Sequence, residues 1–269
     1  MKGLSKSVVL RTMMNKLHVL LFLMINLLLP AEGAELKFVT HDFPPFSYES
    51  GGTLSGAAID IVRQTCSEIE ISCPIELLPW KRSQFKVRRG HVQAMLVIGW
   101  NNKRAQWLSF SPPLLKTQYG FFVNRSNPLD YLSLSDLAGA RVGVLESSNT
   151  FSHLTKIRQQ MIESNLKPIS IQGIHDNNLV FKMLDNEGRN IEMIYSNRDV
   201  GNTLIVNNNL KNVRYAGPNE ELYYYIGFGR KHADKELVER FNNGFMKLQQ
   251  AGVIQDILAQ YNLEGVEPD

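Results

Sequence analysis

From residue 34 onward the chain alternates short apolar runs with amphipathic stretches. In its first part this pattern predicts strands at 36–39, 75–78 and 92–98, with helices between them at 57–69 and 82–89. The order strand, helix, strand, helix, strand is typical of a parallel sheet with helices on both faces.

A second series of the same kind follows residue 123. It predicts strands at 141–145, 169–172, 191–195 and 213–216, and helices at 151–164, 178–186 and 199–207. A strand at 223–228 and two helices at 235–250 and 253–261, separated by Gly252, complete the chain. Two such units joined by extended segments predict an α/β fold with two lobes.

The N-terminal residues are typical of a secretory signal peptide. Basic residues precede an almost wholly apolar run from Leu17 to Leu29, and Ala31-Glu32-Gly33 supplies the small residues of a cleavage site. The run is shorter than the roughly 20 residues that a membrane span needs, although an uncleaved anchor is the alternative. No cysteine follows it for lipid attachment, so we expect removal of residues 1–33 and release into the periplasm.

The net charge of the chain belongs to its N-terminal segment. Residues 1–33 hold four of the 29 basic residues and one of the 26 acidic residues, so 25 of each remain. This balance, with basic residues scattered along the chain, predicts no surface that would attract nucleic acid.

Cys66 and Cys73 are the two cysteines of the chain. In an oxidising compartment such a pair is predicted to form a disulfide, here between the end of a helix and the next strand. Loop-closure entropy makes so short a ring worth about 2–3 kcal/mol. We expect no metal site at this pair, because no histidine or further cysteine lies nearby.

Arg104 lies just beyond the buried strand predicted at 92–98. The carboxyl ends of such strands are where α/β folds bind ligands. The planar guanidinium group matches a carboxylate with two hydrogen bonds. Arg104 is therefore a candidate for binding an acidic ligand, and an ordinary surface arginine is the alternative.

Aromatic residues follow two other predicted strands. Phe43 belongs to the proline-stiffened loop 41–48, and Trp80 follows the strand at 75–78. Flat rings can form apolar walls around a small ligand. Packing of these rings against the core is the alternative.

Ser148 and Asn149 stand between a predicted strand and a predicted helix. The unpaired N–H groups and the dipole at the start of a helix favour an anion. Helix capping alone would also explain both residue types.

Enzyme signatures are missing from the sequence, including nucleophile elbows, phosphate loops, zinc-binding motifs and glycine-rich dinucleotide turns. We predict no cofactor. Glu146 and Asp199 could act as an acid or a base, and a solvated role is the alternative for each.

The chain from residue 34 resembles the family-three extracellular solute-binding proteins of polar amino acid ABC transporters. These proteins have the type II periplasmic binding protein fold. The resemblance rests on segments in the family's order: the pocket loop at 43–48, the start of a helix at 54–61, Lys103-Arg104 followed by Phe110-Ser111-Pro112-Pro113, the strand at 137–144 and the closing helices at 248–261. Leu114 replaces a tyrosine of the arginine motif. Cys66 and Cys73 also have the spacing of a disulfide found in basic amino acid binders.

The resemblance implies roles for the candidate residues. Phe43 and Trp80 would be aromatic walls, Arg104 would bind a ligand carboxylate, and Ser148 and Asn149 would add hydrogen bonds from the second lobe.

Two positions depart from the family pattern. Asn197 stands where amino acid binders have an aspartate for the α-ammonium group, and a neutral amide cannot supply that charge. Asp199, two residues later, is a candidate to replace it. Gly99 takes the place of a hydroxyl residue that is usual beside the arginine.

We therefore predict a monomeric periplasmic binding protein with lobe 1 at 34–117 and 223–269 and lobe 2 at 118–222. A two-segment hinge near 116–120 and 222–226 would let the lobes close on a small carboxylate-bearing ligand and deliver it to an inner-membrane ABC permease. The alternatives are a periplasmic dehydratase of cyclohexadienyl acids, with Glu146 or Asp199 as the acid, and the sensor domain of a membrane kinase.

Overall fold

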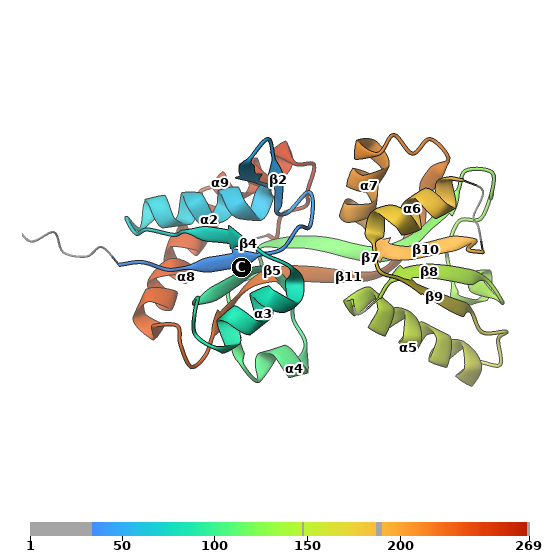
Figure 1. Cartoon of the computed structure of the whole chain (residues 1–269), viewed down its shortest axis with the longest axis horizontal. Coiled ribbons are helices and arrows are strands. Elements are labelled where there is room, and N and C mark those ends of the chain that lie inside the picture. The colour runs from blue at the N-terminus through green and yellow to red at the C-terminus, as the bar shows by residue number, and fades with distance from the viewer. Residues whose placement is uncertain (1–33, 147, 187–189, 268–269) are drawn as a thin grey trace, which may run out of the picture. The chain divides into compact units, whose positions relative to one another are not determined.

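The computed structural model describes residues 34–146, 148–186 and 190–267. The predicted signal peptide at 1–33 lies outside the described residues. Leu36 and the residues after it belong to one compact unit, and helices and strands alternate along it as predicted (Figure 1). Within the described ranges, no helix combines the length and the apolar character needed to cross a membrane.

A single mixed sheet holds the fold together, with strand order β4-β1-β5-β11-β7-β10-β8-β9. At one end β1 runs parallel to β4 and β5, and at the other end β8 runs parallel to β9 and β10. These strands are β1 (Phe38–Thr40), β4 (Ile75–Leu77), β5 (Ala94–Gly99), β8 (Arg141–Leu145), β9 (Ser170–Ile174) and β10 (Met193–Asn197). The two parallel sets correspond to the two predicted units.

Two long antiparallel strands, β7 (Leu115–Asn124) and β11 (Val213–Gly229), join the two sets (Figure 1). Their register pairs Leu115 with Tyr224 and Tyr119 with Glu220, so the two predicted crossing segments lie side by side. The prediction of separate strands at 213–216 and 223–228 is wrong in this respect. The polar stretch between them has no strand-like pattern, but it pairs with β7 through two register shifts.

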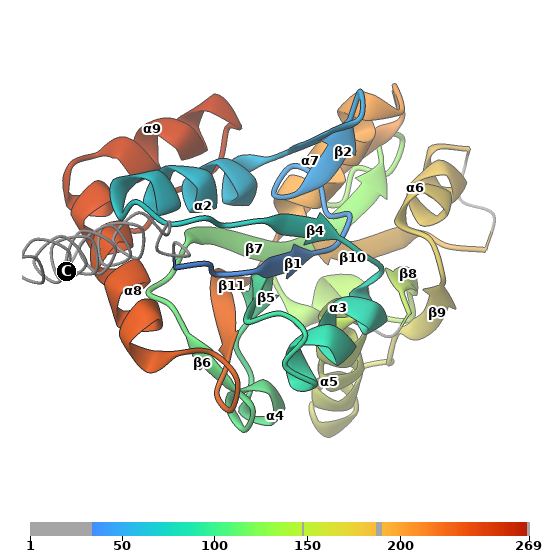
Figure 2. The ribbon, with the colours of Figure 1, turned by 60° about the vertical axis from the view of Figure 1, so that its left-hand side comes forward.

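Helices cover both faces of each parallel set (Figures 1 and 2). In the first lobe α2, α8 and α9 lie on one face, and α3 with the short α4 lies on the other. In the second lobe α6 and α7 lie opposite α5. The helices are α2 (Ala57–Glu68), α3 (Trp80–Arg88), α4 (Asn102–Ala105), α5 (Asn149–Glu163), α6 (Asn177–Asp185), α7 (Arg198–Asn207), α8 (Lys235–Gln250) and α9 (Val253–Gln260).

The helix boundaries agree with the sequence pattern to within two residues, apart from the four-residue α4, which was not predicted. One of these differences concerns the site. Helix α3 begins at Trp80, two residues before the predicted start, so Trp80 is the first residue of a helix. The pattern also missed four other short elements: β2 (Tyr48–Ser50), β3 (Thr53–Ser55), β6 (Leu108–Phe110) and the 3-10 helix η1 (Leu134–Leu137).

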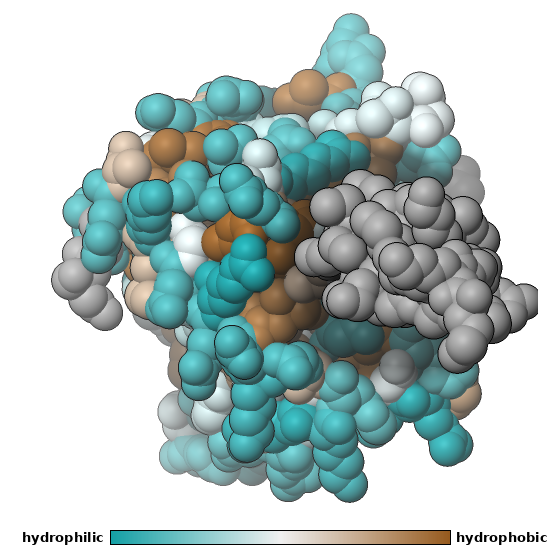
Figure 3. All heavy atoms as spheres, turned by 90° about the vertical axis from the view of Figure 1, so that its left-hand side faces the viewer, coloured by the Kyte–Doolittle hydropathy of each residue, from teal (hydrophilic) through white to brown (hydrophobic). Residues whose placement is uncertain are grey.

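The core follows the alternation of side chains along the strands. Phe38 packs on the α8 side against Phe228 and Phe241, with ring centroids 6.5 and 5.6 Å away. Its neighbour Val39 belongs to the cluster on the α3 side. In Figure 3 the coloured residues on the face at the left of Figure 1 are mainly hydrophilic, as expected where amphipathic helices turn their apolar sides inward.

A bulge interrupts this alternation near the end of β5. Val97 has a φ of 54°, which is rare for a β-branched residue, and the register with β11 shifts between Tyr225 and Gly227. Leu96 and Val97 both belong to the α2–α8 cluster, whereas Ile98 belongs to the α3 cluster. The bulge therefore sets the direction of the strand end that leads to Arg104.

The structure contains the predicted disulfide. Cys66 in α2 is bonded to Cys73, two residues before β4, with an S–S distance of 2.02 Å. The bond ties the C-terminal part of α2 to the edge strand of the sheet.

Candidate functional site

Arg104 lies on α4, at the carboxyl end of β5. Asn101 caps this short helix by accepting a hydrogen bond from the Arg104 backbone N–H at 2.8 Å. The Arg104 side chain turns back toward the strand, where Nη1 donates to the Gly99 carbonyl oxygen at 2.6 Å. Nη2 lies 3.4 Å from Oδ1 of Asn149, on α5 of the second lobe. The candidate arginine therefore faces both lobes.

Aromatic side chains surround the guanidinium group. Its central carbon lies 5.1 Å from the centre of the Trp80 ring. Tyr119 on β7 and Tyr224 on β11 are buried beside it, and burial raises the pKa of both hydroxyl groups. Burial also lowers the pKa of Arg104, which means that its positive charge has lost hydration.

No described carboxylate forms an ion pair with Arg104. A guanidinium group has five N–H donors, and two of them are used in the bonds to Gly99 and Asn149. The site therefore holds a partly dehydrated cation with spare hydrogen-bonding capacity.

Gly99 is buried beside Arg104 and Asn149. A side chain there would meet Nδ2 of Asn149 at 3.3 Å and Nη1 of Arg104 at 3.6 Å. A side chain at this position would therefore press on Asn149, whose amide takes up space where the family usually has a hydroxyl group.

Phe43 lies in the loop after β1. Its ring centroid is 5.0 Å from His41 and 5.8 Å from Tyr224, and His41 lies 4.8 Å from Trp80. The structure thus brings Phe43, Trp80, Gly99, Arg104 and Asn149 together.

Ser148 and Asn149 have different positions, although they are neighbours. The Ser148 hydroxyl group caps α5 by accepting from the Phe151 N–H at 3.0 Å, and it donates to the Leu145 carbonyl oxygen. Capping thus occupies Ser148, whereas Asn149 reaches Arg104 from the first turn of the helix.

Asn197 and Asp199 lie at the start of α7, in a buried network. Asn197 caps the helix by accepting from the N–H groups of Asp199 and Val200, and it donates to Thr117 Oγ1 at 2.9 Å and to the Tyr224 hydroxyl at 3.3 Å. Asp199 accepts from Thr117 at 2.6 Å. Through Tyr224, this network reaches the groups around Arg104.

The sequence pattern did not single out His41, Tyr119 or Tyr224 as site residues. His41 lies at the end of β1, and its Nδ1 atom is buried without a hydrogen-bond partner among the described residues. Burial and the nearby Arg104 lower the pKa of His41 to about 4. The one available signal was position, since His41 follows a buried parallel strand, as Arg104 does.

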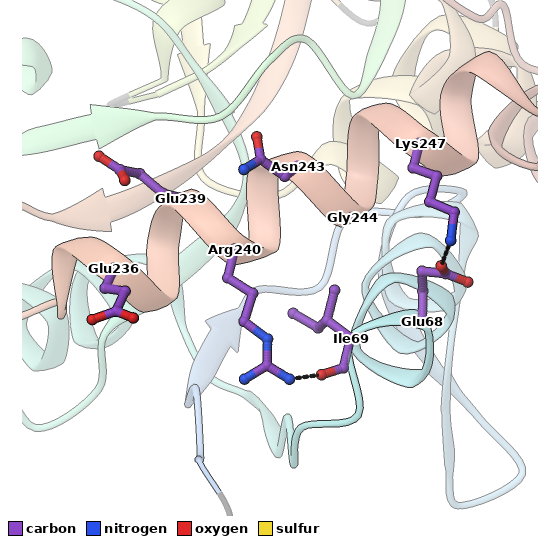
Figure 4. A pocket seen from close by; sticks show the side chains of 8 residues that line it. All are labelled: Glu68, Ile69, Glu236, Glu239, Arg240, Asn243, Gly244 and Lys247. Carbon is purple, nitrogen blue, oxygen red and sulfur yellow. Dashed lines mark hydrogen bonds and ion pairs between the residues drawn. The ribbon is translucent and has the colours of Figure 1, made fainter.

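A surface depression lies between α2 and α8, apart from these residues (Figure 4). It is lined mainly by charged and polar side chains, and two of them are already engaged: Arg240 donates to the Ile69 carbonyl oxygen, and Lys247 pairs with Glu68. Nothing in this depression matches the candidate chemistry at the end of β5.

The two α/β lobes are joined by paired strands and meet at a charged and aromatic site. The family model of bacterial extracellular solute-binding proteins, family 3, matches residues 36–264, and the chain belongs to this family. A search of curated proteins finds no match.

Solved structures with low sequence identity share the fold. A histidine kinase sensor domain with similarity to periplasmic binding proteins has a TM-score of 0.71 at 20% identity, covering 85% of this chain and 97% of that one. An ancestral arginine-binding protein bound to arginine has a TM-score of 0.69 at 19% identity, with coverages of 84% and 97%. An ancestral amino acid-binding protein described as a precursor of cyclohexadienyl dehydratase has a TM-score of 0.69 at 17% identity, with coverages of 84% and 94%.

Proposed function

We propose that the protein binds a small carboxylate-bearing solute, an amino acid or a related acid, in the periplasm and delivers it to an inner-membrane ABC permease. The monomer would close lobe 1 (34–117 and 223–269) and lobe 2 (118–222) around the ligand. The observation that carries this proposal is Arg104, a partly dehydrated cation between aromatic rings with no carboxylate partner among the described residues.

A ligand carboxylate suits this arrangement for two reasons. The unused N–H donors of Arg104 can form a two-pronged pair with its oxygens. The carboxylate also compensates a charge that burial has made less favourable. Asn149 lies on the other lobe, so closure would complete the contacts around the ligand.

The family supports the transport role, since its members are extracellular solute-binding proteins. Among the structural neighbours, one is the substrate-binding protein of an amino acid ABC transporter, with 17% identity, a TM-score of 0.68 and coverages of 85% and 99%.

The dehydratase alternative needs a carboxyl group that is free to donate a proton in the site. Glu146 is paired with His175 at 3.0 Å, and Asp199 is paired with Arg198 at 2.8 Å. Asp199 is therefore not free, Glu146 is bonded to an exposed histidine, and this geometry favours binding over catalysis.

The test is a comparison of variants of Arg104 with a neighbour on the same helix. A thermal-shift screen of amino acids, dicarboxylates and hydroxy and keto acids first selects the tightest ligand. Calorimetry then measures its affinity for Arg104→Ala, Arg104→Lys and the control Lys103→Ala, whose side chain is exposed.

We expect Arg104→Ala to weaken binding at least ~10-fold, because a charge-assisted pair is lost. Arg104→Lys should recover part of that loss, since lysine keeps the charge but not the planar fork. Lys103→Ala should bind like the unmodified protein. Unchanged affinity in Arg104→Ala would refute the proposed role.

A further inference from the structure

We propose that the preferred ligand carries a neutral hydroxyl or keto group, and no ammonium group, on the carbon beside its carboxylate. This inference rests on the proposed function, because it assumes that Arg104 binds the carboxylate. It concerns the other end of the ligand, where a zwitterionic amino acid needs an anionic or strongly accepting partner.

Asn197 cannot serve as that partner in the described arrangement. Its Oδ1 atom already accepts from the backbone N–H groups of Asp199 at 2.9 Å and Val200 at 3.1 Å. Its Nδ2 atom donates to Thr117 and Tyr224. The side chain is buried and neutral, so it offers an ammonium group neither charge nor a free acceptor.

Asp199 does not replace the missing charge. Its two oxygens are taken by Arg198 Nε at 2.8 Å and by the Thr117 hydroxyl group at 2.6 Å. Arg198 also pairs with Glu264 at 2.9 Å. The Asp199 charge is therefore compensated within the protein, and only 6% of the residue is exposed.

The other nearby acids are engaged or lie outside the cluster. Glu146 pairs with His175 and Glu220 pairs with His153. Asp42 is exposed, and partial burial raises its pKa. No ion pair in the described part of the chain joins Asp42 to Arg104.

Beside Arg104, the other side chain of this cluster with an unused polar atom is neutral. His41 has a buried Nδ1 atom without a partner in the described part of the chain, and its ring stacks on Phe43 and packs against Trp80. The same Trp80 ring lies under Arg104. An uncharged imidazole has one donor and one acceptor, which suits a hydroxyl or keto oxygen.

The charge of the site also favours a ligand without an ammonium group. Arg104 is the uncompensated ion of the cluster within the described residues. A carboxylate neutralises it, whereas an added ammonium group would bring a second positive charge into a site of low polarity. A simple anion therefore complements the site better than a zwitterion.

The experiment compares acids that differ only at the carbon beside the carboxylate. The purified protein is titrated by calorimetry with three series: phenylalanine, phenyllactate and phenylpyruvate; leucine and its 2-hydroxy and 2-keto analogues; glutamate, 2-hydroxyglutarate and 2-oxoglutarate. We expect the hydroxy or keto member of the best series to bind at least ~10-fold more tightly than the amino acid. Equal or tighter binding of the amino acid would overturn the inference.

Two variants sharpen the comparison. Asn197→Asp keeps a side-chain acceptor for the cap of α7 and adds a negative charge, so it should move the preference at least ~10-fold toward the amino acid. An unchanged preference would count against the inference. Asp42→Asn should leave the preference as it is, and selective loss of amino acid binding would identify Asp42 as an ammonium partner and overturn the inference.

Arg104→Ala separates the two proposals. Suppose that the unmodified protein prefers amino acids and that Arg104→Ala abolishes their binding. This result would contradict the present inference and leave the proposed function standing. Absence of binding for every acid, in the three series and in the thermal-shift screen, would contradict both.

Discussion

The end of β5 and the start of α7 both place polar groups between the lobes, but they differ in how far those groups are satisfied. Arg104 and His41, at the ends of parallel strands in the first lobe, keep unused donors or acceptors. Asn197 and Asp199, at the start of α7, use their hydrogen-bonding atoms on Thr117 and on neighbouring backbone or side chains.

The difference separates recognition from stability. A ligand gains most from groups that the protein has dehydrated and left unpaired, because it restores their missing interactions. Groups that already satisfy one another stabilise the fold and offer a ligand little. We therefore expect truncation to alanine to lower mainly the affinity in the first set and mainly the free energy of unfolding in the second set.

The largest effect on stability is expected for Asp199→Ala. It leaves Thr117 without its acceptor and Arg198 without a buried counter-ion, at a cost of about 3 kcal/mol. Urea unfolding of this variant beside Arg104→Ala tests the contrast. Equal losses of unfolding free energy in the two variants would show that the two sets of residues do not differ in this way.

Acidification should weaken the fold through His41. Its pKa is about 4 in the folded protein and near 6.5 when unfolded, so the unfolded chain binds a proton that the folded one does not. The contribution of a neutral His41 to the free energy of unfolding is thus complete above pH 6.5. It decreases as the pH falls toward 4, by at most about 3 kcal/mol.

Urea unfolding from pH 7 to pH 4 measures how the free energy of unfolding depends on pH. Comparison with His41→Gln separates the contribution of His41 from that of the carboxylates that titrate in the same range. The variant should lose less stability on acidification than the unmodified protein. Parallel pH profiles would show that His41 is not held neutral.

Asn149→Ala should have the smallest effect. The contact with Arg104 is long, at 3.4 Å, and a ligand carboxylate would compete for the same donor. We expect a loss of affinity of about 2- to 5-fold, because a neutral hydrogen bond is worth about 0.5–1 kcal/mol in such a place. Calorimetry with the ligand selected in the thermal-shift screen measures this loss of affinity. A loss as large as that of Arg104→Ala would show that the second lobe contributes as much to binding as Arg104 does.

The sequence predicted the elements well because their apolar faces are local patterns. The helices α2 and α8, with their regular spacing of buried residues, were placed almost to the residue. The strand β11 was divided because its middle is polar and owes its extended shape to pairing with β7.

The site was harder to predict because its contacts join distant parts of the chain. Arg104, Phe43 and Trp80 followed from their places after predicted strands, and Asn149 from its place at the start of a helix; the resemblance then implied their roles. The roles of Tyr119 and Tyr224 depend on the register between β7 and β11, which no local pattern contains. His41 needed the stacking of Phe43 and Trp80 to become a buried, unpaired group.

The paired strands β7 and β11 also shape the mechanics of the protein. Two unpaired connecting strands could each rotate independently. Backbone hydrogen bonds join β7 and β11 into a two-stranded ribbon instead. Gly120 and Gly217 lie in close contact across it, so that a Cβ atom on Gly120 would come within 2.4 Å of the Gly217 carbonyl oxygen. If the lobes close as we propose, a swing of one lobe would have to twist both strands together.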